Sequence, residues 1–238
     1  MTYVLVHGGG FDSRCWSRLV PFLDGDVVAV DLPGRGRRPA PLEELGVADF
    51  VAAVVDEVEQ RELTDVVLVG HSLAGITLPG VAAAVPHRVA RLVFVSCSVP
   101  APGTSVLDAL GSFSPATAEV AAQIGDGILT ESGTLHPDLA AAMFCNDMDD
   151  EQLAFTVGIM VPESFRVVSE PLGSTGLPAT LPTTYVRLLR DASLSLATQD
   201  EMLTRLGQPD VVDLDAGHMA MITRPEALAA LLVEVATS

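Results

Sequence analysis

The sequence predicts an α/β fold built on a mostly parallel, doubly wound sheet. Six short runs rich in aliphatic and β-branched residues are typical of strands, and segments with helical periodicity separate them. Hydrophobic residues make up 49% of the chain, which suits a parallel sheet that is buried on both faces. Because 238 residues can enclose one substantial core, we expect residues 1–238 to form a single domain.

The strands and helices alternate along the chain. The runs that predict strands are 2–6, 26–31, 65–70, 91–96, 183–189 and 210–214. After the second strand, apolar residues recur at helical spacing from Val47 to Val58, which predicts one buried helix face. The last helix is expected to begin with a capping box formed by Thr223 and Glu226. Repeated strand–helix alternation indicates a parallel sheet covered by helices on both sides.

The third strand ends in a motif that is typical of a nucleophile. Ser72 follows the apolar run 66–69, with Gly70 two residues before it and Ala74 two residues after it. A sharp strand-to-helix turn needs small residues at these positions, and it exposes the serine hydroxyl at its tip. The usual pattern has glycine at both flanks, so Ala74 departs from it, and Gly75 follows directly. We expect Ser72 to be a nucleophile rather than an ordinary turn serine.

Two further residues supply the base and the acid that such a serine needs. His218 follows the strand 210–214 and Gly217, and it is the expected base. Asp191 follows the strand 183–189, and it is the expected acid. All three residues therefore come after predicted strands, where the carboxyl ends of a parallel sheet build their sites.

The other histidines fit different roles. His7 is expected to order the glycine-rich loop beside it, and His71 to point away from its neighbouring serine. His87 lies on a predicted surface loop, and His136 lies in the long segment before the fifth strand. The absence of Cys/His spacing typical of a metal site predicts no metal.

The first strand runs into a cluster of glycines, Gly8 to Gly10. Such a loop can turn backbone N–H groups toward a developing oxyanion, with the N–H of Leu73 as the second donor. We expect Gly9 to be the first donor, with Gly10 the next candidate. A phosphate cradle is disfavoured because the loop has neither G-K-[ST] nor G-x-G-x-x-G.

Taken together, these motifs resemble the α/β-hydrolase superfamily, and within it the plant methylesterase and hydroxynitrile lyase group with its bacterial esterase relatives. The segments that carry the resemblance are Val6-His7-Gly8-Gly9 followed by Trp16, Asp31-Leu32-Pro33-Gly34, Gly70 to Gly75, Asp191 with Gln199, and Gly217 to Met221. The resemblance spans nearly the whole chain and is weak between about residues 100 and 182.

The resemblance implies that residues 99–182 are a helical lid, inserted before the last two strands. Short helices are predicted within this segment at 137–144 and 149–159. Its apolar residues either line a substrate pocket or pack the lid against itself; they are Leu107, Leu110, Met143, Met160 and three phenylalanines. We expect a substrate pocket that includes Gly8, Cys97, Phe113, Phe144, Phe155 and Met219.

The same resemblance separates two chemistries. The lyases of the group carry a threonine beside the oxyanion loop and a lysine after the catalytic histidine, whereas this chain has Gly8 and Met219 there. Neither side chain can donate a hydrogen bond to a cyanohydrin or hold cyanide by charge. We therefore expect a serine hydrolase, without a cofactor, that cleaves a carboxylic ester of a small, mainly apolar substrate through an acyl-enzyme.

Other hypotheses remain open. A lactonase or a secondary-metabolite tailoring hydrolase or cyclase would use the same three residues, and a hydroxynitrile lyase or a non-catalytic ligand receptor is less well supported. The sequence indicates neither the identity of the substrate nor whether the chain is a monomer or a homodimer.

Composition narrows the partners and the location. A net charge of −18 argues against nucleic acid and anionic membranes as partners, and no apolar run is long enough to span a membrane. Three widely spaced cysteines and a strand that starts at residue 2 predict a cytoplasmic enzyme without a signal peptide; the cysteines are Cys15, Cys97 and Cys145. Asp31 is expected to cap a turn, and the basic run Arg35, Arg37, Arg38 to be a solvated loop.

Overall fold

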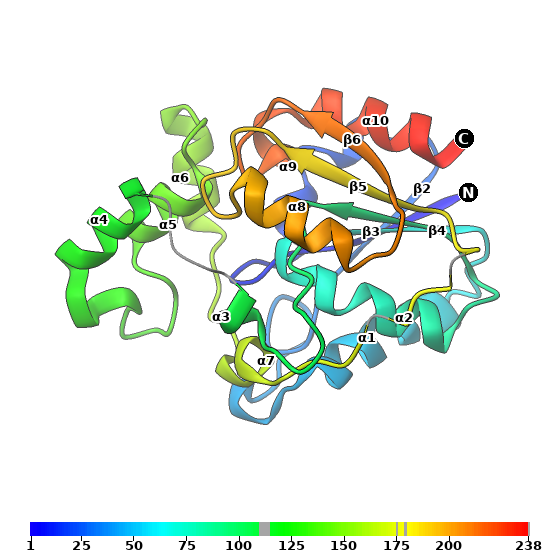
Figure 1. Cartoon of the computed structure of the whole chain (residues 1–238), viewed down its shortest axis with the longest axis horizontal. Coiled ribbons are helices and arrows are strands. Elements are labelled where there is room, and N and C mark those ends of the chain that lie inside the picture. Colours follow the sequence, from blue (N-terminus) through cyan, green and yellow to red (C-terminus); the bar gives the residue numbers. More distant parts are fainter. Residues whose placement is uncertain (110–114, 175, 179, 238) are drawn as a thin grey trace.

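A parallel sheet of six strands forms the centre of the molecule (Figure 1). The structure is a computed structural model, and it describes residues 1–109, 115–174, 176–178 and 180–237. The strands lie in the order β2-β1-β3-β4-β5-β6 and every neighbouring pair is parallel; they are β1 (Thr2–Val6), β2 (Asp26–Val30), β3 (Val66–His71), β4 (Val89–Val95), β5 (Thr183–Leu188) and β6 (Asp210–Leu214). The predicted α/β fold is confirmed.

Helices cover both faces of the sheet because successive side chains of each strand point to opposite sides. Val4, Leu68 and Phe94 belong to one buried face. That face packs against α1 (Val47–Gln60), α2 (Leu78–Ala84) and α8 (Leu196–Thr204). Leu5 and Val69 belong to the other face. It packs against η1 (Ser13–Trp16), η2 (Val20–Phe22), α9 (Ala220–Thr223) and α10 (Pro225–Thr237).

The sequence pattern predicts the buried face of helix α1 correctly, but not the start of the last helix. Helix α1 buries Phe50, Val54 and Val58, as its periodicity predicts. The capping box predicted for the last helix is wrong: Thr223 is the final residue of α9, and its N–H donates to Met219 O at 3.1 Å. Its buried hydroxyl makes no hydrogen bond within the described structure. Helix α10 therefore begins at Pro225 without this cap.

The segment between β4 and β5, residues 99–182, is called the insertion below. Its helical elements are α3 (Val106–Ala109), α4 (Pro115–Ile124), η5 (Gly125–Ile128), α5 (Pro137–Phe144), α6 (Asp150–Gly158) and α7 (Phe165–Ser169). Both predicted helices are present, and Asp149 caps α6 by accepting the Gln152 N–H at 2.8 Å. Figure 1 shows α4, α5 and α6 beyond the carboxyl ends of the strands, while α3 and α7 lie nearer α1. Within the described ranges, the structure contains no helix with the length and apolar character needed to cross a membrane.

Candidate active site

Ser72 lies at the tip of a sharp turn between β3 and the short helix η4 (Ser72–Ile76). Its φ of +53° is in the left-handed region, which non-glycine residues rarely adopt and which costs conformational energy. Gly70 has no room for a side chain, because an added Cβ would lie 2.5 Å from Leu78 Cδ1 and 3.0 Å from Ala74 Cβ. The strained strand-to-helix turn predicted from these small residues is therefore present.

The three residues that follow strands β3, β5 and β6 meet at one edge of the sheet. His218 Nε2 lies 3.0 Å from Ser72 Oγ, and His218 Nδ1 lies 2.7 Å from Asp191 Oδ2. The side chains of His218 and Asp191 are almost completely buried. These distances are within hydrogen-bond range, so a continuous polar chain connects the serine oxygen to the aspartate.

Four donors hold the Asp191 carboxylate. The N–H groups of Ser193 and Leu194 donate to Oδ1 at 2.7 and 2.8 Å, and Ser96 Oγ donates to Oδ2 at 2.6 Å beside His218. Burial raises the pKa of Asp191, but the neighbouring imidazole and these hydrogen bonds lower it overall. The carboxylate is therefore held in its ionised form.

The loop that carries Asp191 is itself fixed by Gln199, which belongs to the motif noted in the sequence. The Gln199 side-chain oxygen accepts the Leu188 N–H at 2.9 Å, and its amide nitrogen donates to the carbonyls of Leu188 and Leu194 at 3.0 and 2.9 Å. This buried amide ties the end of β5 to the turn after Asp191.

The insertion contacts the loops that carry both His218 and Asp191. The Phe144 ring stacks on the His218 imidazole, with centroids 5.2 Å apart and an interplanar angle of 25°. Asp147 Oδ2 accepts the Gly217 N–H at 2.8 Å, and Asn146 Nδ2 donates to Arg190 O at 2.8 Å. An added Cβ at Gly217 would lie 2.4 Å from Asp147 Oδ1, so a side chain there would displace the Asp147 carboxylate.

The glycine loop lies beside the serine. Gly9 and Leu73 both line the cleft next to Ser72, and an added Cβ at Gly9 would lie 2.9 Å from Leu73 Cδ2. The Gly10 N–H is engaged elsewhere, since it donates to Glu163 Oε2 at 3.0 Å. This hydrogen bond argues against Gly10 as an oxyanion donor and leaves Gly9 as the candidate.

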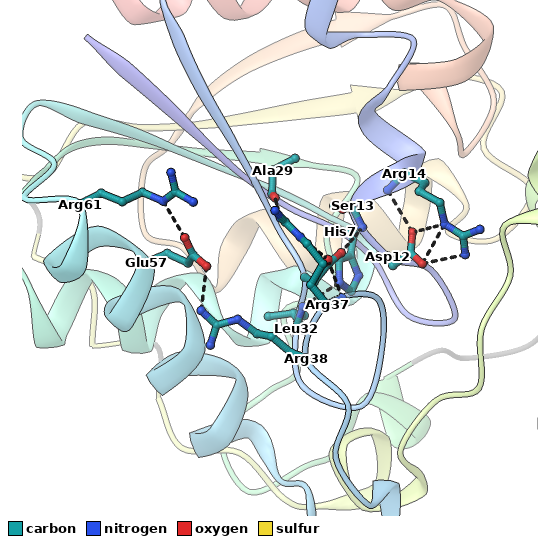
Figure 2. Close-up of polar contacts among 11 residues, drawn as sticks. His7, Asp12, Ser13, Arg14, Ala29, Leu32, Arg37, Arg38, Glu57 and Arg61 are labelled. Atoms are coloured by element: carbon teal, nitrogen blue, oxygen red, sulfur yellow. Dashed lines mark hydrogen bonds and ion pairs between the residues drawn. The ribbon is translucent and has the colours of Figure 1, made fainter.

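His7 orders the glycine loop as expected, and His71 contacts the loop that carries His218. His7 Nδ1 donates to Gly8 O at 2.8 Å. The Leu32 N–H donates to His7 Nε2 at 3.2 Å (Figure 2). His71 Nε2 donates to the His218 carbonyl at 2.9 Å. Burial and the nearby Arg35 lower the pKa of His7 to about 4, while burial lowers the pKa of His71 far below its ordinary value.

The buried His7 is expected to make the protein less stable in acid. The unfolded chain binds a proton at His7 below a pKa of about 6.5, whereas the folded protein binds it only near pH 4. Stability is therefore lost as the pH falls through this window, by ~2 kcal/mol from pH 7 to pH 5 for this residue. Urea unfolding at both pH values measures this loss. The variant His7→Gln should be less stable at pH 7 but should depend less on pH, and equal pH slopes for the two proteins would contradict the assignment.

An apolar cleft of about 370 Å³ opens above Ser72. Apart from Leu73, the aliphatic, aromatic and methionine side chains that line it come from the insertion and include Val106, Leu107, Leu135, Met143, Phe144, Met160 and Val168. Ile128, Leu129 and Phe165 also line it and are largely exposed to solvent. The polar residues of its wall are Ser98, Glu163, Ser164 and Ser193 beside Ser72. The cleft therefore offers mostly hydrophobic contacts to a bound molecule.

The pocket residues predicted from the sequence are only partly brought together. Phe144 lines the cleft, whereas Phe155 lies on α6 with the Arg18 guanidinium 5.1 Å from its ring. Phe113, like Leu110, lies outside the residues that the structure describes. The placement of Phe155 corrects the prediction because its helix turns this ring toward the protein's own surface arginine.

The small or sulfur-containing pocket candidates also lie behind the cleft rather than in its wall. Met219 is completely buried in the core with α9 and α10. Cys97 is buried, and its thiol donates to Gly70 O at 3.2 Å. Gly8 faces the turn, where an added Cβ would lie 2.9 Å from Ser72 Cβ. Gly8 and Cys97 shape the site through packing against the turn.

The basic loop after β2 was predicted to be solvated, but this holds for only part of it. The Arg35 side chain is completely buried and pairs with Glu163, with Nη2 and Oε1 2.6 Å apart. Arg37 remains 70% exposed, and both its N–H and its guanidinium donate to Asp31 at 3.0 Å. Asp31 also accepts the Ser13 N–H, which confirms its expected capping role. Figure 2 shows the Arg14–Asp12 pair and the link from Arg38 through Glu57 to Arg61 around this loop.

Sequence reasoning missed Ser96, Asp147 and Glu163. Ser96 could have been found, because it directly follows β4 beside the strand that carries Asp191. Asp147 and Glu163 come from irregular parts of the insertion, where no periodic pattern marks a contact. The described residues contain no group of three or more His, Cys, Asp or Glu side chains placed to hold a metal ion.

The fold and this arrangement identify a class of protein. A sequence profile described as the alpha/beta hydrolase family matches residues 3–231, and the chain belongs to that family.

Several proteins similar to this chain are named as methylesterases or hydrolases. The chain is 25% identical to putative methylesterase 11, chloroplastic, of Arabidopsis thaliana over 98% of its own length, but it spans only 63% of that protein. It is 27% identical to methylesterase 9 of the same plant, covering 98% of this chain and 97% of the relative. A solved extracellular alpha/beta-hydrolase from a Paenibacillus species superposes with a TM-score of 0.83 at 24% identity, covering 99% of this chain and 98% of that one.

Proposed function

We propose that the protein is a carboxylic-ester hydrolase that uses Ser72, His218 and Asp191 as a catalytic triad. The observation that carries this proposal is the hydrogen-bonded chain from Ser72 through His218 to Asp191, placed at the base of an apolar cleft. The family membership and the relatives named methylesterases support the same conclusion.

Each residue has a definite step in the mechanism. Ionised Asp191 accepts a hydrogen bond from the His218 Nδ1–H, which leaves Nε2 unprotonated and able to take the proton of Ser72 as Oγ attacks the ester carbonyl. The N–H groups of Gly9 and Leu73 stabilise the oxyanion of the tetrahedral intermediate. His218 then gives its proton to the leaving alkoxide, and the acyl group stays on Ser72. Water, activated by His218, attacks the acyl-enzyme and releases the acid.

The cleft indicates the class of substrate. Its volume of about 370 Å³ and its mainly apolar wall fit a small, uncharged, mostly hydrophobic ester. We propose that the insertion acts as a lid that provides this wall, since most of the lining residues belong to it. A lactone would use the same site, so both ester and lactone panels are informative.

The lyase hypothesis receives no support from the site. Gly8 and Met219 occupy the two positions expected to bind a cyanohydrin; Met219 is buried in the core, and Gly8 has no side chain. We further propose a reducing compartment such as the cytoplasm, which is supported by the three free, buried cysteines.

Trapping the acyl-enzyme tests the proposed chemistry. The protein is mixed with 4-nitrophenyl esters of increasing acyl length and with simple lactones, quenched in acid during turnover and digested. We expect ester cleavage and a peptide containing Ser72 that is heavier by one acyl group. Tight binding of these compounds without turnover would favour a ligand receptor, and turnover without any acyl adduct would favour acid–base chemistry without acylation.

A further inference from the structure

We propose that Glu163 is a positioning residue for the oxyanion hole, acting from the insertion through the backbone of Gly10. This inference rests on the proposed ester hydrolysis, because it concerns how the Gly9 donor is held in place. Glu163 does not act on the substrate directly in this account.

The insertion holds both backbone polar groups of Gly10. The Gly10 N–H donates to Glu163 Oε2 at 3.0 Å, and the Val161 N–H donates to Gly10 O at 2.8 Å. Gly10 has a φ of +72°, so the backbone turns in a left-handed conformation immediately after Gly9. Three consecutive glycines have more backbone freedom than any other sequence. Contacts from outside the loop are therefore needed to hold the Gly9 N–H in one direction.

Glu163 lines the cleft, but its oxygens are already occupied. Oε2 accepts from Gly10 and from Arg35 Nη1 at 2.8 Å, while Oε1 accepts from Arg35 Nη2 at 2.6 Å and from the Ser164 N–H at 2.8 Å. A carboxylate has about four acceptor positions, and these four bonds use them. This saturation favours a positioning role over binding a polar group of the substrate.

Arg35 allows a carboxylate to perform this role next to an oxyanion. Glu163 Oε2 would lie only 3.3 Å from a Cβ added at Gly9, so an unpaired negative charge there would repel the charge that develops on the substrate oxygen. The Arg35 guanidinium is completely buried, forms two parallel hydrogen bonds with Glu163 and lies 5.1 Å from the Phe50 ring centroid. The pair as a whole is neutral, so it can fix Gly10 with little electrostatic cost to the transition state.

A second glutamate of the insertion provides a matched control. Glu170 Oε1 accepts the Val47 N–H at 2.7 Å, and its other oxygen lies 3.5 Å from Arg166 Nε. Its side chain is 27% exposed, against 19% for Glu163. Like Glu163, Glu170 has a carboxylate that accepts a backbone N–H and pairs with an arginine. It differs in that it binds the start of α1 instead of the glycine loop.

The experiment compares Glu163→Ala, Glu163→Gln and Glu170→Ala with the unmodified protein. Each is assayed with a 4-nitrophenyl ester and with a trifluoromethyl ketone, which forms a tetrahedral adduct on a reactive serine. We expect Glu163→Ala to lower kcat and the ketone affinity by about 30-fold, with KM changed less than about threefold. Glu163→Gln keeps an oxygen that can accept the Gly10 N–H, so it should recover at least about fivefold of the lost kcat. Glu170→Ala should change all three quantities by less than about twofold.

Two outcomes would overturn the positioning role. One is equal kcat for Glu163→Ala and Glu170→Ala, and the other is a Glu163→Gln variant as impaired as Glu163→Ala. Thermal unfolding shows which variants are folded. If Glu163→Ala does not fold, the kcat and ketone affinity of Glu163→Gln test the role instead. Values within about fivefold of those of the unmodified protein support the role, and a larger loss overturns it. Failure of the unmodified protein to cleave esters or bind the ketone would instead refute the proposed function.

Discussion

Replacing Ser72 with alanine is expected to lower kcat for ester hydrolysis by about 10⁴-fold. The variant lacks the oxygen that lies 3.0 Å from His218 Nε2, so neither acyl-enzyme formation nor its hydrolysis can occur. The residual rate would come from a water molecule activated by His218 and from the oxyanion donors. Initial rates of 4-nitrophenyl ester cleavage, measured for the variant and for the unmodified protein, give the loss directly.

Two companion variants sharpen this test. Because residues of one catalytic unit are not additive, the double variant Ser72→Ala with His218→Ala should lose about as much as Ser72→Ala alone, within about tenfold. Ser193→Ala changes another serine of the cleft, but it keeps the backbone N–H that donates to Asp191. It should retain activity within about threefold of the unmodified protein. A Ser72→Ala variant that hydrolyses the ester at the unmodified rate would end the assignment of Ser72 as nucleophile.

The catalytic residues could be predicted because their positions follow from sheet topology. Ser72, Asp191 and His218 each come shortly after a strand, and in a parallel sheet the carboxyl ends of β3, β5 and β6 face the same edge. Residues separated by 146 positions, such as Ser72 and His218, are thus brought into contact by regular structure. The periodicity of each strand and the residues of the turn after it are visible in the local sequence, and they are enough to place these three residues.

The residues that surround the catalytic chain could not be predicted in the same way. Glu163 and Asp147 belong to irregular backbone of the insertion. Their contacts with Gly10 and Gly217 depend on how the insertion folds back onto the sheet. Arg35 lies in a loop of three arginines, but its side chain is completely buried against Glu163, whereas Arg37, paired with Asp31, is 70% exposed. Burial of a charge depends on such a partner, and a partner 128 positions away leaves no local pattern.

The role of the small residues at the turn was only partly visible in the sequence. Ala74, which departs from the usual glycine, is accommodated, and its Cβ is one of the atoms that a side chain at Gly70 would meet. The tighter position is Gly75, one residue later. An added Cβ there would lie 2.3 Å from Ser98 O and 2.8 Å from Cys97 Cβ. The backbone after β4 therefore excludes any side chain at position 75.

Gly75→Ala is accordingly expected to destabilise the protein by about 3 kcal/mol and to lower Tm by about 10 °C. The obstructing Ser98 oxygen is backbone, and it cannot move away as the end of a flexible side chain would. Ser98 also donates its N–H to Ser72 O at 2.9 Å, so moving this segment shifts the nucleophile itself. We therefore expect kcat to fall by about 100-fold in the fraction that remains folded.

Gly158→Ala is the control for the generic effect of replacing glycine. Gly158 is the last residue of α6, and an added Cβ there meets no described atom within 4 Å. Alanine has the higher helix propensity and reduces the freedom of the unfolded chain, so this variant should be as stable as the unmodified protein or more stable by up to about 1 kcal/mol. Urea unfolding of both variants separates the two effects. Equal stability of Gly75→Ala and Gly158→Ala would mean that the turn and the backbone after β4 can move apart freely. That result would contradict the claim that close packing at Gly75 fixes the position of Ser72.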